Sequence, residues 1–182
     1  MLAYNNCLTQ YGMHLFDKVQ RHFVVDKNIV FSSSGEFSDY QDLCSELDKL
    51  DRTARVNDDK HRYSPKDYAQ YISSMCYKQR NKADPYYLEG VVAGLDKKGG
   101  RFLGFVDLYG TFLELDYVTT GFARHLCGHI INSTWNADCD LQTALNVLEQ
   151  CFKALFVKNC PAREEMAVVV IDQSGIRTDV KK

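Results

Sequence analysis

His125 and His129 stand closest to a spacing that could do chemistry, because they lie four residues apart. On a helix this spacing puts both imidazoles on one face, where they can hold zinc if a third ligand arrives. The residue after His125 is Leu126, whereas a zinc-dependent protease carries glutamate there. We therefore interpret the pair as polar positions on an amphipathic helix, and we predict no metal site and no cofactor.

Cysteine is the second candidate for chemistry, and the chain has seven: Cys7, Cys44, Cys76, Cys127, Cys139, Cys151 and Cys160. Their odd number and the absence of a CxxC spacing indicate neither a disulfide framework nor a zinc site. Cys44, Cys76 and Cys151 fall in step with apolar neighbours, as reduced cysteines do when they act as small hydrophobes. Cys160 precedes a proline, and nothing beside it would lower a thiol pKa. We predict free thiols in a reducing compartment, the cytoplasm or the nucleus.

The bulk properties exclude several classes of function. The chain has 182 residues and a formal net charge of −2, with acidic and basic residues intermixed. This pattern argues against nucleic-acid and membrane-surface partners, which need a concentrated basic patch. No apolar run approaches the roughly 18 residues of a membrane span, and Met1–Asn6 lacks the features of a secretion signal. We predict one domain over residues 1–182.

Hydrophobic periodicity predicts the elements of the first third of the chain. Arg21–Val25 and Ile29–Ser32 have the composition of two strands joined by a turn. From Glu36 the period changes to that of a helix, with an apolar stripe of Phe37, Tyr40, Leu43, Cys44, Leu47 and Leu50. Arg52–His61 is polar and charged, so we predict a solvated loop there.

A second helix is predicted by its start and stop signals. Ser64 is in place as the N-cap, with Pro65 at the first helical position and Asp67 completing a capping box. The helix must end before Pro85, which cannot continue it. Its buried face is predicted to be Tyr68, Tyr71, Ile72, Met75 and Cys76.

The second half of the chain is predicted to contain strands, then two helices, then a strand. The strands are Leu88–Leu95, Phe102–Leu108 and Thr111–Leu115. A short helix is expected over Thr120–Ile131 and a longer one over Leu141–Val157, with a stripe of Leu141, Leu145, Leu148, Cys151, Phe152 and Leu155. Ala167–Ile171 is expected to be a buried strand, turning at Gln173–Gly175. Strands clustered between helix pairs indicate an α+β fold, a four-layer α-β-β-α sandwich of antiparallel sheets covered by helices.

Four short motifs occur in an order and spacing that match a known family: Tyr11-Gly12, Ser34–Tyr40, Thr119–Ala123 and Val170–Ile176. With these motifs the chain resembles the proteasome β-subunit family, whose fold is that of the N-terminal-nucleophile hydrolases. Arg80–Pro85, read with Phe102–Gly110, most resembles the non-catalytic seventh β position. The resemblance covers nearly the whole chain from Tyr11 onward.

Active members of this family use an N-terminal threonine as nucleophile and its own amine as base, with a lysine, an aspartate and serines organising the site. This chain has no matching threonine: Thr9 comes too late for the first strand, and cleavage at Gly110-Thr111 would discard most of the fold. Leu15–Asp17 occupies the region of the family's lysine, and Lys18 is misplaced by one to a few residues.

The region after the long helix also departs from the active pattern. Lys158–Ala162 stands where active members carry the aspartate and a serine. Asn159 has no carboxylate charge and Ala162 has no hydroxyl. We therefore assign no catalytic, cofactor-binding or metal-binding residue.

The two ends of the sequence differ from the family pattern as well. The resemblance implies a strand pair before Tyr11-Gly12, and only Met1–Thr9 remains for it. We expect at least one N-terminal strand to be missing, either because the record starts downstream of the true start or because a partner segment replaces it. The long C-terminal arm of seventh-position members is not found before Lys182, so clamping of the opposite ring is not expected of this copy.

The resemblance implies a structural subunit of the 20S core particle that supports ATP- and ubiquitin-dependent protein degradation by active neighbours. Its partners would be β subunits of the same and the opposite ring, α subunits and assembly chaperones. A second hypothesis is an active hydrolase, with its threonine upstream of Met1 or with Cys7 or Thr9 exposed by processing. A third is a free-standing sandwich domain.

Overall fold

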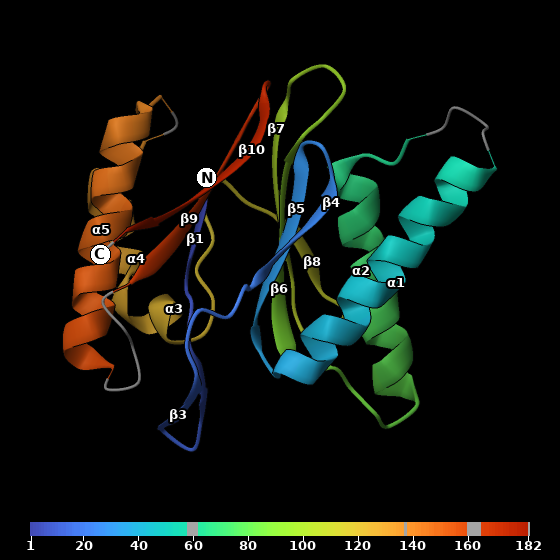
Figure 1. Ribbon diagram of the computed structural model, residues 1–182, viewed down its shortest axis with the longest axis horizontal. Coiled ribbons are helices and arrows are strands. Elements are labelled where there is room, and N and C mark those ends of the chain that lie inside the picture. The colour runs from blue at the N-terminus through green and yellow to red at the C-terminus, as the bar shows by residue number, and fades with distance from the viewer. Residues whose placement is uncertain (58–61, 137, 160–164, 182) are drawn as a thin grey trace. The chain divides into compact units, whose positions relative to one another are not determined.

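The computed structural model describes residues 1–57, 62–136, 138–159 and 165–181 (Figure 1). These residues group into two compact units. The first unit comprises Met1–Arg21, Thr119–Val170 and Arg177–Lys182, and the second comprises His22–Val118 and Ile171–Ile176. Within the described ranges, no helix is long and apolar enough to cross a membrane. The single domain over residues 1–182 stays a prediction.

The second unit is built on five antiparallel strands in the order β4-β5-β6-β7-β8. They are β4 (His22–Asp26), β5 (Ile29–Gly35), β6 (Leu88–Leu95), β7 (Arg101–Val106) and β8 (Phe112–Glu114). All five match predicted strands. The central pair, β5 and β6, is buried along most of its length, with Ser32 opposite Val91. Their Val, Ile and Phe content is typical of strands covered on their faces.

Helices α1 (Phe37–Val56) and α2 (Pro65–Asn81) cover one face of this sheet, α1 over β4 and β5 and α2 over β6 to β8 (Figure 1). The predicted capping box of α2 is confirmed. The Ser64 hydroxyl accepts from the Asp67 backbone N–H at 3.3 Å, and the Asp67 carboxylate accepts from the Ser64 backbone N–H at 2.7 Å. Pro65 occupies the first helical position, where its missing N–H costs nothing.

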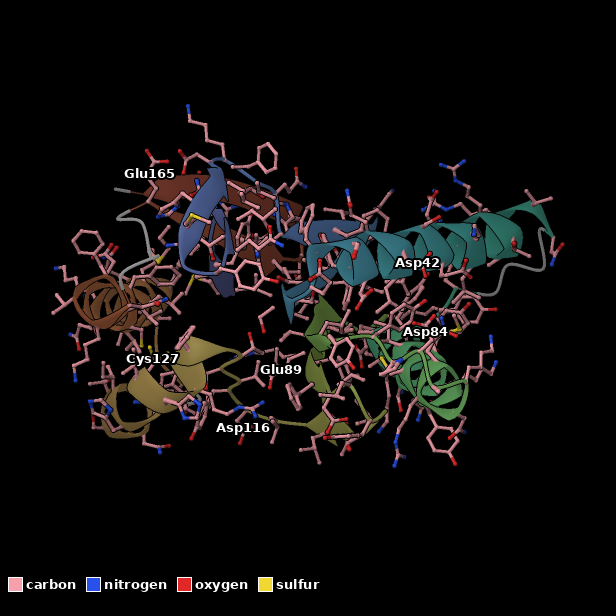
Figure 2. The ribbon with its side chains drawn as sticks, turned by 90° about the horizontal axis from the view of Figure 1, so that it is seen from below. Asp42, Asp84, Glu89, Asp116, Cys127 and Glu165 are labelled. Carbon is pink, nitrogen blue, oxygen red and sulfur yellow. The ribbon has the colours of Figure 1, made fainter. Side chains whose placement is uncertain are left out.

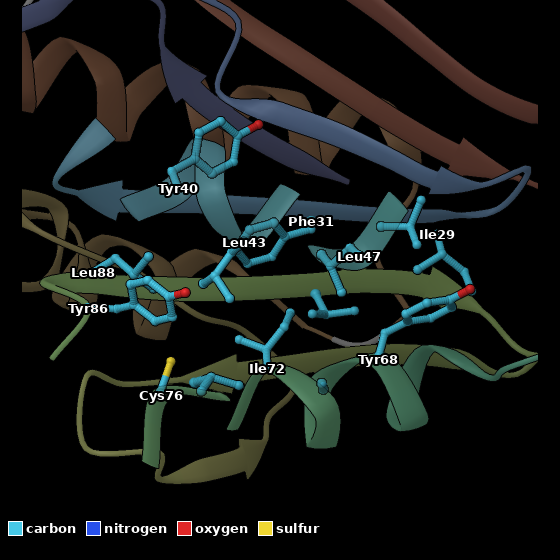
Figure 3. Packing of buried hydrophobic residues seen from close by; sticks show 14 residues of the cluster. Ile29, Phe31, Tyr40, Leu43, Leu47, Tyr68, Ile72, Cys76, Tyr86 and Leu88 are labelled. Atoms are coloured by element: carbon cyan, nitrogen blue, oxygen red, sulfur yellow. The ribbon is translucent and has the colours of Figure 1, made fainter. Parts of the chain in front are cut away.

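The core of the second unit lies between the helices and the sheet. Figure 3 shows Leu43 and Leu47 of α1 and Ile72 of α2 pointing into this layer, and all three are fully buried. Both predicted stripes are confirmed: the remaining members are buried or partly buried in the same cluster. Burying each such side chain contributes about 1.5–3 kcal/mol, so this layer fixes the positions of both helices.

One prediction in this unit was wrong, because α1 continues through Val56 where a loop was expected from Arg52. Arg52 pairs with Asp48 at 2.8 Å and Arg55 pairs with Asp51 at 2.7 Å, both at the i,i+4 spacing. Such pairs stabilise a solvated helical turn that has no apolar stripe to reveal it. Residues 58–61, the end of the predicted loop, lie outside the described residues.

A three-stranded sheet has the order β1-β9-β10. Strand β1 (Leu2–Asn5) runs antiparallel to β9 (Met166–Asp172), and β10 (Gly175–Lys181) follows the predicted turn. Strand β9 is buried from Met166 through Val169, whereas Val170 and Ile171, which were also predicted to be buried, are only partly buried. The segment Met1–Thr9, expected to retain only a remnant of the family's first strands, thus supplies a complete short strand.

A small hairpin that the sequence analysis did not predict follows β1. Strand β2 (Leu8–Gln10) pairs with β3 (Met13–Phe16) across the turn at Tyr11-Gly12. Both turn residues have positive φ, as a two-residue hairpin turn requires. Tyr11, Met13 and Phe16 are exposed, so the strands have little of the in–out alternation that would mark them in the sequence.

Helices α3 (Phe122–Leu126), α4 (Gly128–Thr134) and α5 (Leu141–Lys158) belong to the first unit, where α3 and α4 pack against α5. The single helix predicted over Thr120–Ile131 is wrong, since the chain breaks at Cys127 and restarts at Gly128, a weak helix former. On α5, Val147 and Cys151 are the buried residues, whereas Leu141 is exposed. The predicted stripe is thus largely confirmed: Cys151 is buried, and Leu145, Leu148, Phe152 and Leu155 are half-buried. Val147 is a buried residue outside the stripe.

Each unit combines antiparallel strand pairs with helices, which agrees with the predicted α+β class. The second unit shows the expected sheet with a helical layer on one face (Figure 1). The four-layer order of the sandwich stays a prediction.

Candidate functional site

Cys7, which lies just after β1 in the first unit, is the first candidate nucleophile along the chain. Its side chain is buried, and its thiol donates to the Asn5 side-chain oxygen at 2.7 Å. The same amide oxygen accepts from the Cys7 backbone N–H at 3.3 Å. An amide oxygen is not a base that could take up the thiol proton, so this contact holds the thiol without activating it.

The neighbouring Asn6 ties three distant segments together. Its side-chain amide nitrogen donates to the Glu165 carboxylate, just before β9, at 3.4 Å. Its backbone carbonyl accepts from the Val19 backbone N–H at 2.7 Å. Figure 2 labels Glu165 near the top of that view. The sequence analysis missed this contact because its partners are 159 positions apart and carry no motif. The arrangement positions β1.

Thr9 and Lys18 were the residues nearest to the family's threonine and lysine in type and position. Thr9 lies inside β2, opposite His14, and Lys18 lies in an exposed turn beyond β3 with a φ of 61°. Within the described ranges, no side-chain hydrogen bond or ion pair joins Thr9 to Lys18. The hairpin therefore does not bring the hydroxyl and the amine together as a catalytic pair.

The remaining positions compared with active members lie at the end of α5 and in one turn. Asn159 is the C-cap of α5, and its backbone N–H donates to the Leu155 carbonyl at 2.8 Å. Gly110-Thr111 connects β7 to β8, inside the second unit. Cys160 and Ala162 lie outside the described residues.

The two histidines fall on different elements. His125 is near the end of α3 and His129 is in α4, and both side chains are exposed. The break at Cys127 lies between them, so they are not one turn apart on a continuous helix. Within the part of the chain that the structure describes, no group of three or more His, Cys, Asp or Glu side chains could hold a metal ion.

Three further thiols, those of Cys44, Cys76 and Cys151, have raised pKa values, whereas hydrogen bonding with Cys151 lowers the pKa of Cys127. Burial raises the pKa of Cys44 and that of Cys76 to about 11 each. Cys127 donates to the Cys151 carbonyl at 3.6 Å, and hydrogen bonding to Cys127 together with burial raises the pKa of the Cys151 thiol (Figure 2 labels Cys127). Because the thiolate is the nucleophilic form, Cys44, Cys76 and Cys151 are packing residues at neutral pH.

Comparison with known proteins assigns the chain to a family. The family model "Proteasome subunit" matches residues 4–171. The chain belongs to the proteasome subunit family. Proteasome subunit beta type-4 of Arabidopsis thaliana is 30% identical over 91% of this chain and 68% of its own length. Proteasome subunit beta type-4 of Drosophila melanogaster is 29% identical over 96% and 66%, respectively. The probable proteasome subunit beta type-7 of Schizosaccharomyces pombe is 28% identical over 97% and 69%.

This proteasome chain is thus a β-type subunit, as its resemblance predicted, and it spans about two thirds of the length of these relatives. Membership of the family implies assembly with other proteasome subunits. The motifs quoted from Tyr11-Gly12 to Val170–Ile176 almost all fall inside the matched residues, so the same stretches carry both observations.

Proposed function

We propose that this chain is a non-catalytic, structural subunit of the 20S proteasome core particle at the seventh β position. It fills one place in the β ring and supports ATP- and ubiquitin-dependent protein degradation by active neighbours. The observation that carries the proposal is its similarity over 91–97% of its length to β subunits named type-4 and type-7. In this proposal the fold is the four-layer α-β-β-α sandwich, and the particle resides in the cytoplasm and nucleus.

The geometry of the described residues supports a role without bond cleavage. The Cys7 thiol is bound to an amide oxygen, Thr9 lies within a hairpin, and Lys18 stands in an exposed turn. A threonine protease needs a hydroxyl, an adjacent base and a neighbouring cation in one place. The proposed partners are β subunits of both rings, α subunits and assembly chaperones.

The test combines assembly with covalent labelling. The tagged chain is expressed in cells of the organism that encodes it. On a native gel it should migrate at the size of the assembled particle. A threonine-directed covalent inhibitor, such as an epoxyketone, should then label neighbouring subunits and leave this chain unlabelled. Migration as a free monomer would contradict the subunit role, and label on this chain would favour the active hydrolase.

A further inference from the structure

An exposed aromatic and basic surface lies where the C-terminal end of α2 meets the β7–β8 turn. Tyr77 of α2 is 53% exposed and Tyr109 of the turn is 56% exposed. The guanidinium carbon of Arg80 lies 5.6 Å from the centre of the Tyr109 ring, within cation–π range. We name Tyr77, Arg80 and Tyr109 the α2–turn surface.

The turn that carries Tyr109 is held by an unusually complete set of hydrogen bonds. The Asp107 carboxylate accepts from the backbone N–H of Tyr109 at 2.9 Å and of Thr111 at 2.8 Å. The Ser73 hydroxyl of α2 donates to the Gly110 carbonyl at 2.5 Å. These bonds fix the Tyr109 backbone before any partner arrives, which reduces the entropy lost on binding.

Gly110 permits the close approach of this turn to α2. Its φ is 83°, and a Cβ built there would lie 2.7 Å from the Ser73 carbonyl oxygen and 2.9 Å from the Tyr77 Cβ. The turn and helix are thus in direct contact, with Gly110, the residue after Tyr109, packed against the backbone of α2 at Ser73 and Tyr77. Half-exposed tyrosines and an arginine stacked on one of them are the composition of interface hot spots.

The charge of this region is complementary to an acidic partner. Lys78 and Lys82 are exposed on α2 next to Arg80, and within the described ranges none of these three cations has an ion pair. Asp84, which Figure 2 labels beyond the end of α2, is the nearest acidic residue in sequence. Favourable interaction with the helix dipole accounts for cations here. It does not account for two exposed tyrosines, Tyr77 on the helix and Tyr109 on the pre-formed turn.

We propose that the α2–turn surface docks a carboxylate-bearing segment of a neighbouring proteasome subunit, an inference that rests on the proposed ring-subunit function. Arg80, Lys78 and Lys82 meet the carboxylates, and the two tyrosine rings cover the apolar part of the segment. A protein partner is favoured over nucleic acid because the cations are confined to one helix end in a chain with a net charge of −2.

The first test compares charge and ring removal with matched controls in the tagged chain. Arg80→Glu and Tyr109→Ala should each lower incorporation into the particle at least about tenfold on native gels, the loss of one interface hot spot. The controls are Lys98→Glu, an exposed cation on the β6–β7 turn, and Tyr87→Ala, an exposed tyrosine whose backbone bonds are retained. The controls should assemble like the parent chain, and circular dichroism should show all four variants folded.

The second test identifies the partner's chemistry. A zero-length carbodiimide coupling of the purified particle should join Lys78 or Lys82 to an aspartate or glutamate of another subunit, read by mass spectrometry. The inference would be overturned if parent and variants assembled equally well, or if the two lysines coupled to no subunit. Either result would leave the proposed ring-subunit function intact. Nucleic acid recovered on these lysines would overturn it also. A parent chain that itself fails to join the particle would refute the proposed function instead.

Discussion

Tyr86 shows how one buried hydroxyl secures α1 against the sheet. Its side chain is 5% exposed, and its hydroxyl donates to the Asp42 carboxylate at 2.5 Å. Tyr86→Phe should lower the free energy of unfolding by about 1.5–3 kcal/mol, the contribution of a hydrogen bond to a charged acceptor. The matched control is Tyr68→Phe, because the Tyr68 hydroxyl lies 3.3 Å from Asp51. Urea unfolding that found a larger loss in the control would contradict the assignment.

The same tyrosines predict a dependence of stability on alkaline pH. Burial first, and then Asp42, raises the pKa of Tyr86, and burial and Asp51 raise that of Tyr68. Below the ordinary tyrosine pKa of about 10 both states are protonated and the contribution is complete. Above it the unfolded state releases protons first, so stability is lost as pH rises. The parent should lose unfolding free energy more steeply above about pH 10 than the Tyr68→Phe, Tyr86→Phe double variant, and parallel curves would refute this.

Gly35 allows β5 to pass into α1 at a point where no side chain fits. Its φ is 108°, and a Cβ there would lie 2.3 Å from the Tyr87 carbonyl oxygen, which also accepts from the Glu36 N–H at 2.8 Å. Gly35→Ala should cost about 3 kcal/mol or more, because backbone strain and a clash add. Gly12→Ala has positive φ but open space, so it should cost about 1 kcal/mol. Thermal unfolding of the two variants measures both costs. Equal losses of stability in Gly35→Ala and Gly12→Ala would contradict the prediction.

At the scale of elements, the N-terminus of α2 depends on its capping box. Ser64→Ala removes the hydroxyl that accepts from the Asp67 N–H and should destabilise the chain by about 0.5–2 kcal/mol. The N-cap of α1, Glu36, makes no side-chain cap bond, so Glu36→Ala should change stability by less than about 0.5 kcal/mol. The denaturant midpoints of the two variants measure these losses of stability. A larger loss for Glu36→Ala than for Ser64→Ala would contradict the role of the capping box.

Elements with a buried face were predictable, whereas those without one were not. The strands β4 to β8 and helix α2 carry apolar periodicity and turn or cap residues such as Ser64 and Gly110, and they were placed from sequence. The last turn of α1 is held by Arg52 and Arg55 in solvent-exposed pairs, which resemble a polar loop in sequence. The break at Cys127 was missed because Gly128, a weak helix former, was not weighed, and because the contact of Cys127 with Cys151 of α5 joins residues far apart in sequence.

For the functional residues as well, features of the local sequence were predictable and contacts made by the fold were not. The mismatches at Thr9, Lys18 and Asn159 were readable because the family's pattern fixes which residue types belong there. The Ser73–Gly110 contact and the stacking of Arg80 on Tyr109 join residues about 30 positions apart or more through the fold. Only Tyr109-Gly110, the turn between two predicted strands, was marked in the sequence, and a turn signal alone does not indicate a surface.

At the scale of the whole molecule, depleting a subunit whose role is structural should affect the particle differently from inactivating a subunit that cleaves peptides. A ring of heterologous contacts closes only when every place is filled. Depleting this chain should therefore lower cleavage of acidic, basic and apolar fluorogenic peptides together, while smaller precursors accumulate on native gels. Inactivating the nucleophile of an active subunit would instead remove one cleavage specificity and leave the particle assembled.

Rescue separates the two roles in the same cells. A copy carrying Thr9→Ala should restore assembly and every cleavage activity, because no hydrogen bond among the described residues joins the Thr9 side chain to a base, His14 opposite it in the hairpin included. Cys7→Ser should do the same, since a serine hydroxyl can keep the bond to Asn5. If either copy rebuilt the particle but left one peptide uncleaved, that residue would be the nucleophile, and the chain would be an enzyme.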